Sequence, residues 1–279
     1  MTNLQNLNDI PVYIISFNRL SDLKKLVHFL EQEGLKNIHI IDNASSFPPL
    51  LDYYKSLPYP IHRMDKNYGH MVFYEADEFK DVRENQYYIL TDPDILPIEE
   101  SPHDFMKLFY DLLQKYPKAT KVGFALKTDD LPEQNRMNKL IIKWEQQFYK
   151  HRLNWPKPDV YLSSLDTTFA LYRPKKEWKK GFYTAIRTGY PYEARHLPWY
   201  KDLNDLTEED KFYNSLDCGS GHWVNPEKEK GIEELLLGKD VWPWYQKLFS
   251  IKKATRRYIV RIFGLKITIK RKDKGMRAK

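Results

Sequence analysis

Residues Tyr87–Pro97 read Tyr-Tyr-Ile-Leu-Thr-Asp-Pro-Asp-Ile-Leu-Pro, and this stretch decides the fold. It opens with a short apolar run rich in residues that favour β-structure, which predicts a buried strand. Pro93 cannot donate to a strand ladder and biases Asp92 towards an extended conformation, so we expect the strand to end there. Asp92 and Asp94 would then follow the carboxyl end of a core strand, where ligands bind in open α/β sheets.

Two carboxylates at this spacing repel each other unless a positive group lies between them. Mg²⁺ and Mn²⁺ prefer carboxylate oxygens and share their coordination shell with substrate phosphates. The pattern therefore predicts a divalent-metal site at Asp92 and Asp94. The alternative is an Asx-type turn that only closes the strand, because Asp-Pro-Asp is ordinary turn chemistry.

The segments before this stretch predict strands that alternate with helices. The apolar pattern predicts strands over Pro11–Ser16, Ile38–Ile41 and Ile61–Met64. Apolar residues at helical spacing predict a helix from Leu20 to Gly34, and Leu50–Leu57 is a candidate short helix. Repeated βα units of this kind predict an α/β fold with a mostly parallel sheet.

Each predicted strand is followed by polar residues that should converge on one edge of the sheet. These residues are Asn18 and Arg19, then Asp42, then Asn67 and Gly69, then Asp92 and Asp94. Their position predicts a nucleotide pocket, although neither the Gly-x-Gly-x-x-Gly fingerprint nor a P-loop signature is present.

The region after the acidic stretch is harder to assign. An amphipathic helix is predicted over Asp104–Tyr116, strands over Val122–Leu126 and Leu165–Arg173, and a short helix over Glu208–Leu216. Residues 128–161 show helical periodicity only across Leu140–Phe148. Residues 188–200 are dense in Gly, Pro, Tyr and Trp.

Charge is unevenly distributed along the 279 residues. The net charge is +7, but residues 251–279 contain twelve Lys and Arg residues and one acid, a net +11. Residues 1–250 therefore carry −4, which argues against nucleic-acid binding across the whole surface. Cys218 is the single cysteine, which is typical of a reducing compartment. We expect no secretory signal and no membrane-spanning segment.

Four segments taken together resemble a known enzyme family. They are Ile14–Arg19, Ile41–Ser46, Asn67–His70 and Leu90–Asp94. In this order they are similar to nucleotide-sugar-dependent glycosyltransferases of the GT-A fold, and closest to the bacterial family 2-like enzymes that build surface polysaccharides. The resemblance covers residues 11–100 and becomes loose beyond them. It implies a GT-A-like (Rossmann-like), mostly parallel central sheet flanked by helices.

The resemblance also implies roles for the loop residues. Asp94 would bind Mn²⁺ or Mg²⁺ directly, and Asp92 would bind the ribose or the metal shell. Asn18, Arg19, Asn67 and Gly69 would line the nucleotide, with a plain surface loop as the alternative. Asp42 would accept a hydrogen bond from the base or ribose, unless it is a turn-forming residue.

In the second half, Asp166 is the first candidate for the catalytic base, with a cap or salt-bridge partner as the alternative. Glu193 and Asp217 are the next candidates, and the second half matches the commonest family 2 enzymes, which carry a paired Glu-Asp, only loosely. His196 resembles the late histidine that completes the metal shell in several such enzymes, or else is structural. Arg195 would pair with the diphosphate. Residues that fit stacking on a sugar, with core packing as the default, are Trp199 and Tyr200, and more weakly His222 and Trp223.

We therefore expect three regions: 1–100 for the nucleotide-sugar, 101–235 for the acceptor, and a basic amphipathic tail over 236–279. In the tail, Leu265, Ile267 and Ile269 alternate with polar or basic residues, a pattern suited to a peripheral membrane anchor. A disordered basic tail, or one that binds RNA, is the alternative.

The predicted function is metal-dependent transfer of a sugar, most simply from a UDP-sugar, to a growing surface glycan at the cytoplasmic face of a bacterial membrane. Displacement with Asp166 as base would invert the anomeric centre. The rivals are a retaining transferase on the same fold and a non-catalytic protein that binds lipid or RNA. A nucleotidyltransferase lacks support, because no Gly-rich basic loop for a triphosphate is present.

Overall fold

The structure, a computed structural model, describes residues 6–133, 135, 137–165, 168–179, 184–216, 249–254, 257–262 and 265–270. It divides into two units, Met1–Pro226 and Glu227–Lys279. Each unit is described by itself below. The predicted regions 1–100 and 101–235 fall mostly in the first unit, and their assignment to donor and acceptor stays a prediction.

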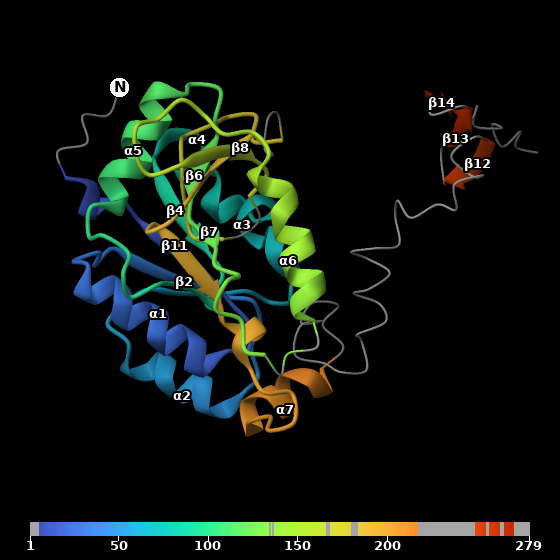
Figure 1. Cartoon of the computed structure of the whole chain (residues 1–279). Helices are drawn as coiled ribbons and strands as arrows, with labels where there is room; N and C mark the ends of the chain where they lie inside the picture. Colours follow the sequence, from blue (N-terminus) through green and yellow to red (C-terminus); the bar gives the residue numbers. More distant parts are fainter. Residues whose placement is uncertain are drawn as a thin grey trace, which may run out of the picture. The chain divides into compact units, whose positions relative to one another are not determined.

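An eight-stranded sheet of order β3-β2-β1-β4-β9-β6-β10-β8 runs through the first unit (Figure 1). Strands β3, β2, β1 and β4 are parallel neighbours, as are β6 and β10. β9 is antiparallel to β4 and β6, and β8 is antiparallel to β10. The strands are β1 Val12–Ser16, β2 Ile38–Asp42, β3 Ile61–Arg63, β4 Tyr88–Thr91, β6 Lys121–Gly123, β8 Val160–Ser163, β9 Ala170–Tyr172 and β10 Ala185–Thr188. The predicted α/β fold with a mostly parallel central sheet is confirmed, and the arrangement is consistent with a GT-A-like, Rossmann-type fold.

Helices flank this sheet (Figure 1). They are α1 Leu20–Gln32, α2 Pro48–Ser56, α3 Val72–Glu75, α4 Lys80–Asn85, α5 Phe105–Lys115, α6 Asn138–Gln146 and α7 Glu208–Ser215. Short 3-10 turns are η1 Leu7–Asp9, η2 Gly69–Met71, η3 Asp77–Phe79, η4 Gln147–Tyr149 and η5 Leu197–Tyr200.

Two aromatic clusters build the core. Phe105 and Phe109 of α5 pack on Phe124 and Phe169, with ring centroids 4.9–5.9 Å apart. A second cluster joins the sheet to α3 and η3 through Tyr13, Phe73, Phe79 and Tyr88, where Phe73 lies 5.0 Å from Tyr13 and 4.8 Å from Tyr88. All these side chains are buried, and burying one such ring contributes roughly 1.5–3 kcal/mol.

A smaller, three-stranded sheet of order β5-β11-β7 contains the residues that follow the acidic stretch. Its strands are β5 Ile95–Pro97, β7 Ala125–Leu126 and β11 Glu193–His196. β5 begins directly after Asp94, and its antiparallel register places Ile95 opposite His196. This pairing joins two segments about a hundred residues apart.

The strands predicted from the sequence differ from those of the structure at three places. The predicted strand Val122–Leu126 is two strands, β6 and β7, which belong to different sheets on either side of Phe124. Within the predicted strand Leu165–Arg173, the described strand is only β9. β11 lies in residues 188–200, where Gly, Pro and aromatic residues conceal the period-two alternation that identifies a strand.

The second unit contains an antiparallel three-stranded sheet of order β12-β13-β14, formed by Phe249–Ala254, Arg257–Ile262 and Leu265–Lys270. The predicted basic tail falls on this region, and the alternating segment Leu265–Lys270 is strand β14. In the described part of the chain, we find no helix with the length and apolar character needed to cross a bilayer.

The α5 cluster gives a test of the core. Phe109→Ala removes a fully buried ring and should lower the free energy of unfolding by about 3–5 kcal/mol. Lys107→Ala on the same helix is the matched control, since Lys107 is 68% exposed and should change stability by about 0.5 kcal/mol or less. Urea denaturation measures both, and equal losses in the two variants would contradict the assigned core.

Candidate functional site

The parallel register brings the four polar loops to one edge of the sheet. Ser16 at the end of β1 lies opposite Asp42 at the end of β2, and Asp42 lies opposite Arg63 at the end of β3. β4 runs parallel to β1, with Thr91 opposite Ile14. The loops that follow these strands therefore leave the sheet on the same side, as the sequence predicts.

Asn18 joins the first loop to the second. Its backbone adopts a left-handed conformation, with φ +51°, which Asn tolerates better than most residues. Its Oδ1 accepts hydrogen bonds from the amides of Ser46 (2.7 Å) and Phe47 (2.8 Å), and its own amide donates to Ser45 Oγ (2.9 Å). Its Nδ2 is buried and has no hydrogen-bond partner among the described residues. The side-chain NH₂ group of Asn18 is thus available to donate to a ligand.

Asp42 is fully buried and holds the second loop. Its Oδ1 accepts hydrogen bonds from the amide of Ser45 (3.1 Å) and the hydroxyl of Tyr54 (3.3 Å), and its Oδ2 lies 3.2 Å from the Arg63 guanidinium. Burial, followed by the charge of Asp42, raises the pKa of the Tyr54 hydroxyl. These contacts are those of a residue that shapes the loop; a contact of Asp42 with base or ribose stays a prediction.

Asn43, which the sequence did not single out, connects the second loop to the third. Its Nδ2 donates to the carbonyl of Gly69 (3.0 Å), and its Oδ1 accepts from the amide of Tyr68 (2.9 Å). Gly69 has φ +71°, a conformation that favours glycine. Asn67 is exposed, and its Oδ1 accepts from the Gly69 amide (2.7 Å).

Asp94 and His196 come together at the fourth loop. Oδ2 of Asp94 lies 3.7 Å from Nε2 of His196, and both side chains are about one-sixth exposed (17% and 16%). The Leu197 amide donates to the Asp94 carbonyl (2.8 Å), which extends the β5–β11 pairing by one bond. The His196 ring packs edge-on against Trp199, with centroids 4.8 Å apart. The structure therefore brings together two of the three predicted metal ligands.

The third predicted ligand, Asp92, is partly exposed, and its carbonyl accepts from the Thr91 hydroxyl (2.9 Å). Bonds from a divalent ion to carboxylate oxygen or imidazole nitrogen measure about 2.1 Å, so atoms 3.7 Å apart suit shared ligation. Among the described residues, no cluster of three or more His, Cys, Asp or Glu side chains could hold a metal ion. The donor chemistry of Asp94 and His196 fits an ion that takes its remaining ligands from water and substrate phosphate.

Arg195 is already paired. Its guanidinium donates to Glu99 Oε2 (2.6 Å) and to Asp130 Oδ2 (2.9 Å). Burial alone would lower the pKa of Arg195, but the hydrogen bonds to the two carboxylates outweigh burial and raise it. A contact between Arg195 and a diphosphate would require exchange of these partners and stays a prediction.

The two aromatic side chains after His196, Trp199 and Tyr200, make contacts within the protein. Tyr200 donates to Asp130 Oδ1 (2.6 Å), and Trp199 is 3% exposed. Trp199 is therefore packed in the core, which is the default expected from the sequence.

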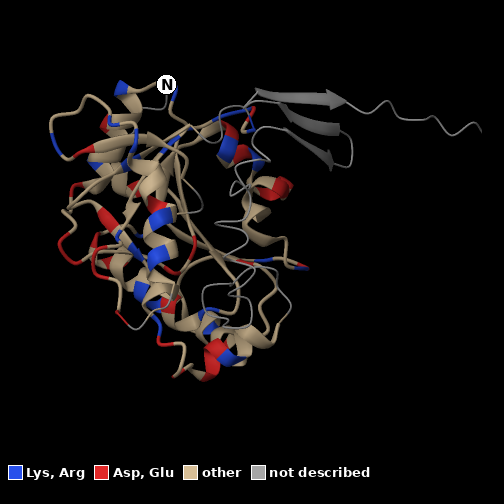
Figure 2. Ribbon diagram, turned by 45° about the vertical axis from the view of Figure 1, so that its right-hand side comes forward, with Lys and Arg blue, Asp and Glu red and all other residues tan. Residues whose placement is uncertain are grey.

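Arg19 lies under helix α7. Its side chain is 5% exposed, its Nη1 is 2.8 Å from Asp210 Oδ1, and its guanidinium stacks over Tyr213 at 3.7 Å. Lys201 contacts the same carboxylate at 2.5 Å. α7 carries acidic and basic residues in close succession (Figure 2). The predicted nucleotide-lining residue Arg19 thus contacts the protein's own acidic helix.

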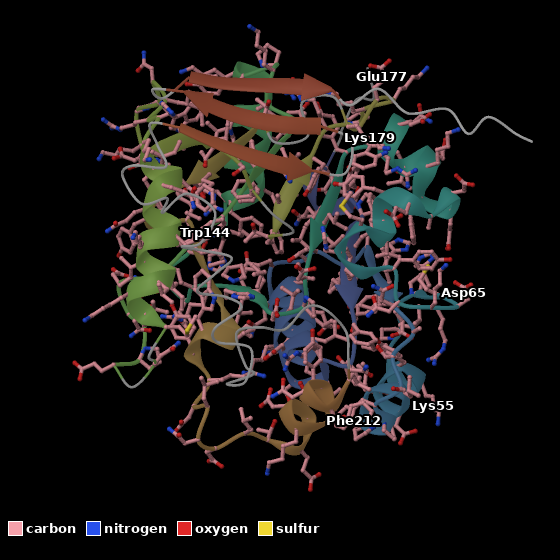
Figure 3. The ribbon with its side chains drawn as sticks, turned by 90° about the vertical axis from the view of Figure 1, so that its right-hand side faces the viewer. Lys55, Asp65, Trp144, Glu177, Lys179 and Phe212 are labelled. Atoms are coloured by element: carbon pink, nitrogen blue, oxygen red, sulfur yellow. The ribbon has the colours of Figure 1, made fainter. Side chains whose placement is uncertain are left out.

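Further contacts close α7 over the first loop. The amide and hydroxyl of Ser21 donate to Glu209 Oε2 at 3.0 and 2.9 Å. Phe212 packs on Phe47, 5.1 Å between centroids, and Figure 3 shows Phe212 near the α2 segment that carries Lys55.

Asp22 is a buried carboxylate that the sequence did not indicate, because it occupies the first turn of an ordinary amphipathic helix. Lys201 Nζ lies 3.6 Å from its Oδ2. Burial raises the pKa of Asp22, Lys201 opposes this, and the charge of Asp94 adds to it. The negative charge of Asp94 thus contributes to the raised pKa of Asp22 at the contact between α1 and α7.

The predictions for the catalytic base are largely untested by this geometry. Asp166 and Asp217 lie outside the described residues, as do His222 and Trp223, the weaker candidates for stacking on a sugar. Glu193 lies on β11, and burial raises its pKa, with Lys127 acting in the opposite direction.

Comparison with known proteins adds one weak similarity. No protein-family model and no curated protein matches the chain. Among solved structures, it is similar to the mannosyltransferase PcManGT from Pyrobaculum calidifontis in complex with GDP-Man and Mn²⁺, with a TM-score of 0.39 and 11% sequence identity. The match covers 61% of this chain and 46% of that one, so this chain spans less than half of that structure's length. A similarity at this level establishes neither a family nor an activity.

The α7 contact gives a test of the electrostatics. Asp210→Ala leaves the Arg19 charge buried without its partner and should lower the free energy of unfolding by about 3–5 kcal/mol. Burial alone would raise the pKa of Asp210, but hydrogen bonds from Lys201 and Thr207 hold it below the usual value. Its stabilisation should therefore be full above about pH 4 and fade as the pH falls further.

Glu208→Ala is the matched control, since Glu208 is exposed on the same helix. Chemical denaturation at neutral and acidic pH measures both variants. An Asp210→Ala loss no larger than that of Glu208→Ala would show that α7 is not held by this ion pair.

Proposed function

We propose that this chain is a metal-dependent glycosyltransferase that uses a nucleotide-sugar donor. The observation that carries the proposal is the 3.7 Å approach of Asp94 to His196 at the edge where four polar loops meet. A carboxylate and an imidazole are ligands that Mn²⁺ accepts. The loops beside them offer neutral polar groups, as recognition of a base and ribose requires.

The chemistry of the donor explains why a metal ion would be needed. When a sugar leaves a nucleoside diphosphate, negative charge grows on the diphosphate, and a bound divalent ion offsets that charge. Asp94 and His196 would hold the ion, and Asp92 would bind the ribose or the metal shell. The leftover Nδ2 donor of Asn18 supports a role for the first loop in binding the nucleotide, because an unsatisfied buried donor costs about 1–3 kcal/mol.

We assign the donor to the UDP-sugars and the catalytic base to Asp166, with Glu193 and Asp217 as the next candidates. A base within hydrogen-bond reach of the acceptor hydroxyl takes its proton as the oxygen attacks the anomeric carbon. A direct displacement of this kind inverts the anomeric centre. A product of retained configuration would replace this mechanism with a retaining one on the same site.

The acceptor proposed is a growing surface glycan, such as lipopolysaccharide or capsule, at the cytoplasmic face of a bacterial membrane. The support is the excess of basic residues in 251–279, which would attract anionic lipid. Residues 236–279 would act as the peripheral membrane-binding region. This brings a soluble donor and a lipid-linked acceptor to the same surface.

Loss of Asp94 tests the activity. Asp94→Ala should reduce metal-dependent turnover of the UDP-sugar by 100-fold or more, about 2.7 kcal/mol or more of transition-state stabilisation, because the ion loses its carboxylate ligand. Asp65→Ala, in the neighbouring loop, is the matched control and should keep near wild-type turnover. Release of UDP, followed with and without Mn²⁺, is the measurement. Full turnover in Asp94→Ala would remove the metal assignment.

The membrane proposal has its own test. Lys266→Ala and Lys270→Ala should each weaken binding to anionic vesicles by about fivefold, since a basic residue near such a surface contributes about 1 kcal/mol. Lys55→Ala and Lys107→Ala remove exposed charges outside the basic region and should leave vesicle binding unchanged. Flotation with phosphatidylglycerol vesicles, and with uncharged vesicles for comparison, measures the effect. Equal effects at all four lysines would argue against a dedicated membrane-binding region.

A further inference from the structure

His39 on β2 and His62 on β3 form a pair away from the candidate site. Nδ1 of His39 lies 3.1 Å from Nε2 of His62, and the ring centroids are 5.4 Å apart. Tyr13 of β1 stacks on His39 at 4.8 Å, and Phe79 of η3 packs edge-on against His62 at 5.4 Å. Two imidazole nitrogens at this distance share one hydrogen.

The outer nitrogen of His39 has a defined partner. Its Nε2 lies 3.0 Å from Oδ1 of Asn37, while Nδ2 of Asn37 donates to the carbonyl of Asp9 at 2.9 Å. A carbonyl only accepts, so the amide NH₂ must face Asp9 and the amide oxygen must face His39. His39 therefore carries its hydrogen on Nε2, and in the neutral ring its Nδ1 is an acceptor.

The contacts of His62 follow from this. Its Nε2 must donate to Nδ1 of His39, and its Nδ1 contacts Oε1 of Glu78 on η3. That last contact also needs a hydrogen, which either the ring or the carboxyl group can carry. The three contacts thus require three hydrogens, whereas two neutral imidazoles and one carboxylate supply two. The chain holds one additional proton.

We propose that His39, His62 and Glu78 form a single proton-binding site that strengthens the attachment of the edge strand β3 to the sheet while it holds three hydrogens. A fourth hydrogen on Nδ1 of His39 would place hydrogens on both facing nitrogens and break the bond between the rings. Loss of one hydrogen would leave one contact without a donor. β3 contains three residues and lies at the sheet edge, where its pairing with β2 and the contacts of Arg63 with Asp42 and Ser45 are the other bonds that hold it.

The surroundings oppose the uptake of a fourth proton. Burial, followed by the neighbouring His62, lowers the pKa of His39, so the folded chain resists the fourth proton. Burial and Glu78 raise the pKa of Tyr13, which keeps the hydroxyl on β1 neutral. Below about pH 6.5 the unfolded chain binds protons that folded His39 does not, so stability falls as the pH drops. This inference does not depend on the proposed transferase activity.

Nitrogen-15 NMR of histidine in the full chain tests the hydrogen count at neutral pH. We expect an unprotonated Nδ1 in His39 and protonated Nε2 atoms in both rings. A strongly downfield proton shared between His62 and Glu78 should disappear in Glu78→Gln. A protonated Nδ1 in His39, or an unprotonated Nε2 in either ring, would overturn the proposal, and these two readings are made on the wild-type chain alone.

Urea denaturation from about pH 5 to pH 9 tests the consequence. The midpoint of wild type relative to His39→Gln should be largest at intermediate pH and fall on both sides. In Glu78→Gln the amide can donate to His62, so the alkaline decline should vanish while the acid decline stays. His103→Gln is the matched control, because His103 pairs with Glu33 but is 89% exposed. A difference between wild type and His39→Gln that is flat with pH would overturn the proposal.

Discussion

The parallel register of β1, β2, β3 and β4 is the constraint on which the candidate site depends. Because Ser16, Asp42 and Arg63 end neighbouring strands opposite one another, their loops must leave the sheet at the same edge. A slip of one residue would turn Asp42 to the other face of the sheet and remove its contact with Arg63. The second constraint is the β5–β11 pairing, which carries His196 to Asp94 across about a hundred residues of sequence.

The polar residues of this edge divide into two groups by their contacts. Asn18, Asp42 and Asn43 are buried and join one loop to the next, so they fix the shape of the site. Asp94 and His196 remain partly exposed and close together. Arg19, expected to line the nucleotide, and Arg195, expected to pair with the diphosphate, are each held by the protein's own carboxylates. The charge that would attract a donor therefore depends more on a bound metal ion than on these arginines.

The sequence allowed the first half of the fold to be predicted because its buried strands are short apolar runs that end in recognisable turn residues. Asp94 and His196 could each be proposed from local pattern and resemblance, but their distance depends on strand β11, which Pro and aromatic residues conceal. The α7 contact could not be predicted, because Arg19 and Asp210 are 191 positions apart. Arg19 follows the first strand and resembles a nucleotide-lining residue, whereas Asp210 reads as an ordinary surface charge. The same holds for His39, His62 and Glu78, whose partnership arises only when β3 pairs with β2.

The measurement that tests the central claim most directly is calorimetric titration of UDP, GDP and CMP into the full chain, with and without Mn²⁺. The account predicts that one nucleotide, UDP, binds and that its binding requires the metal ion. Binding of no nucleotide under either condition would contradict it, and would reduce Asp92–Asp94 to a turn that closes β4. Function would then have to be sought in the basic region 251–279.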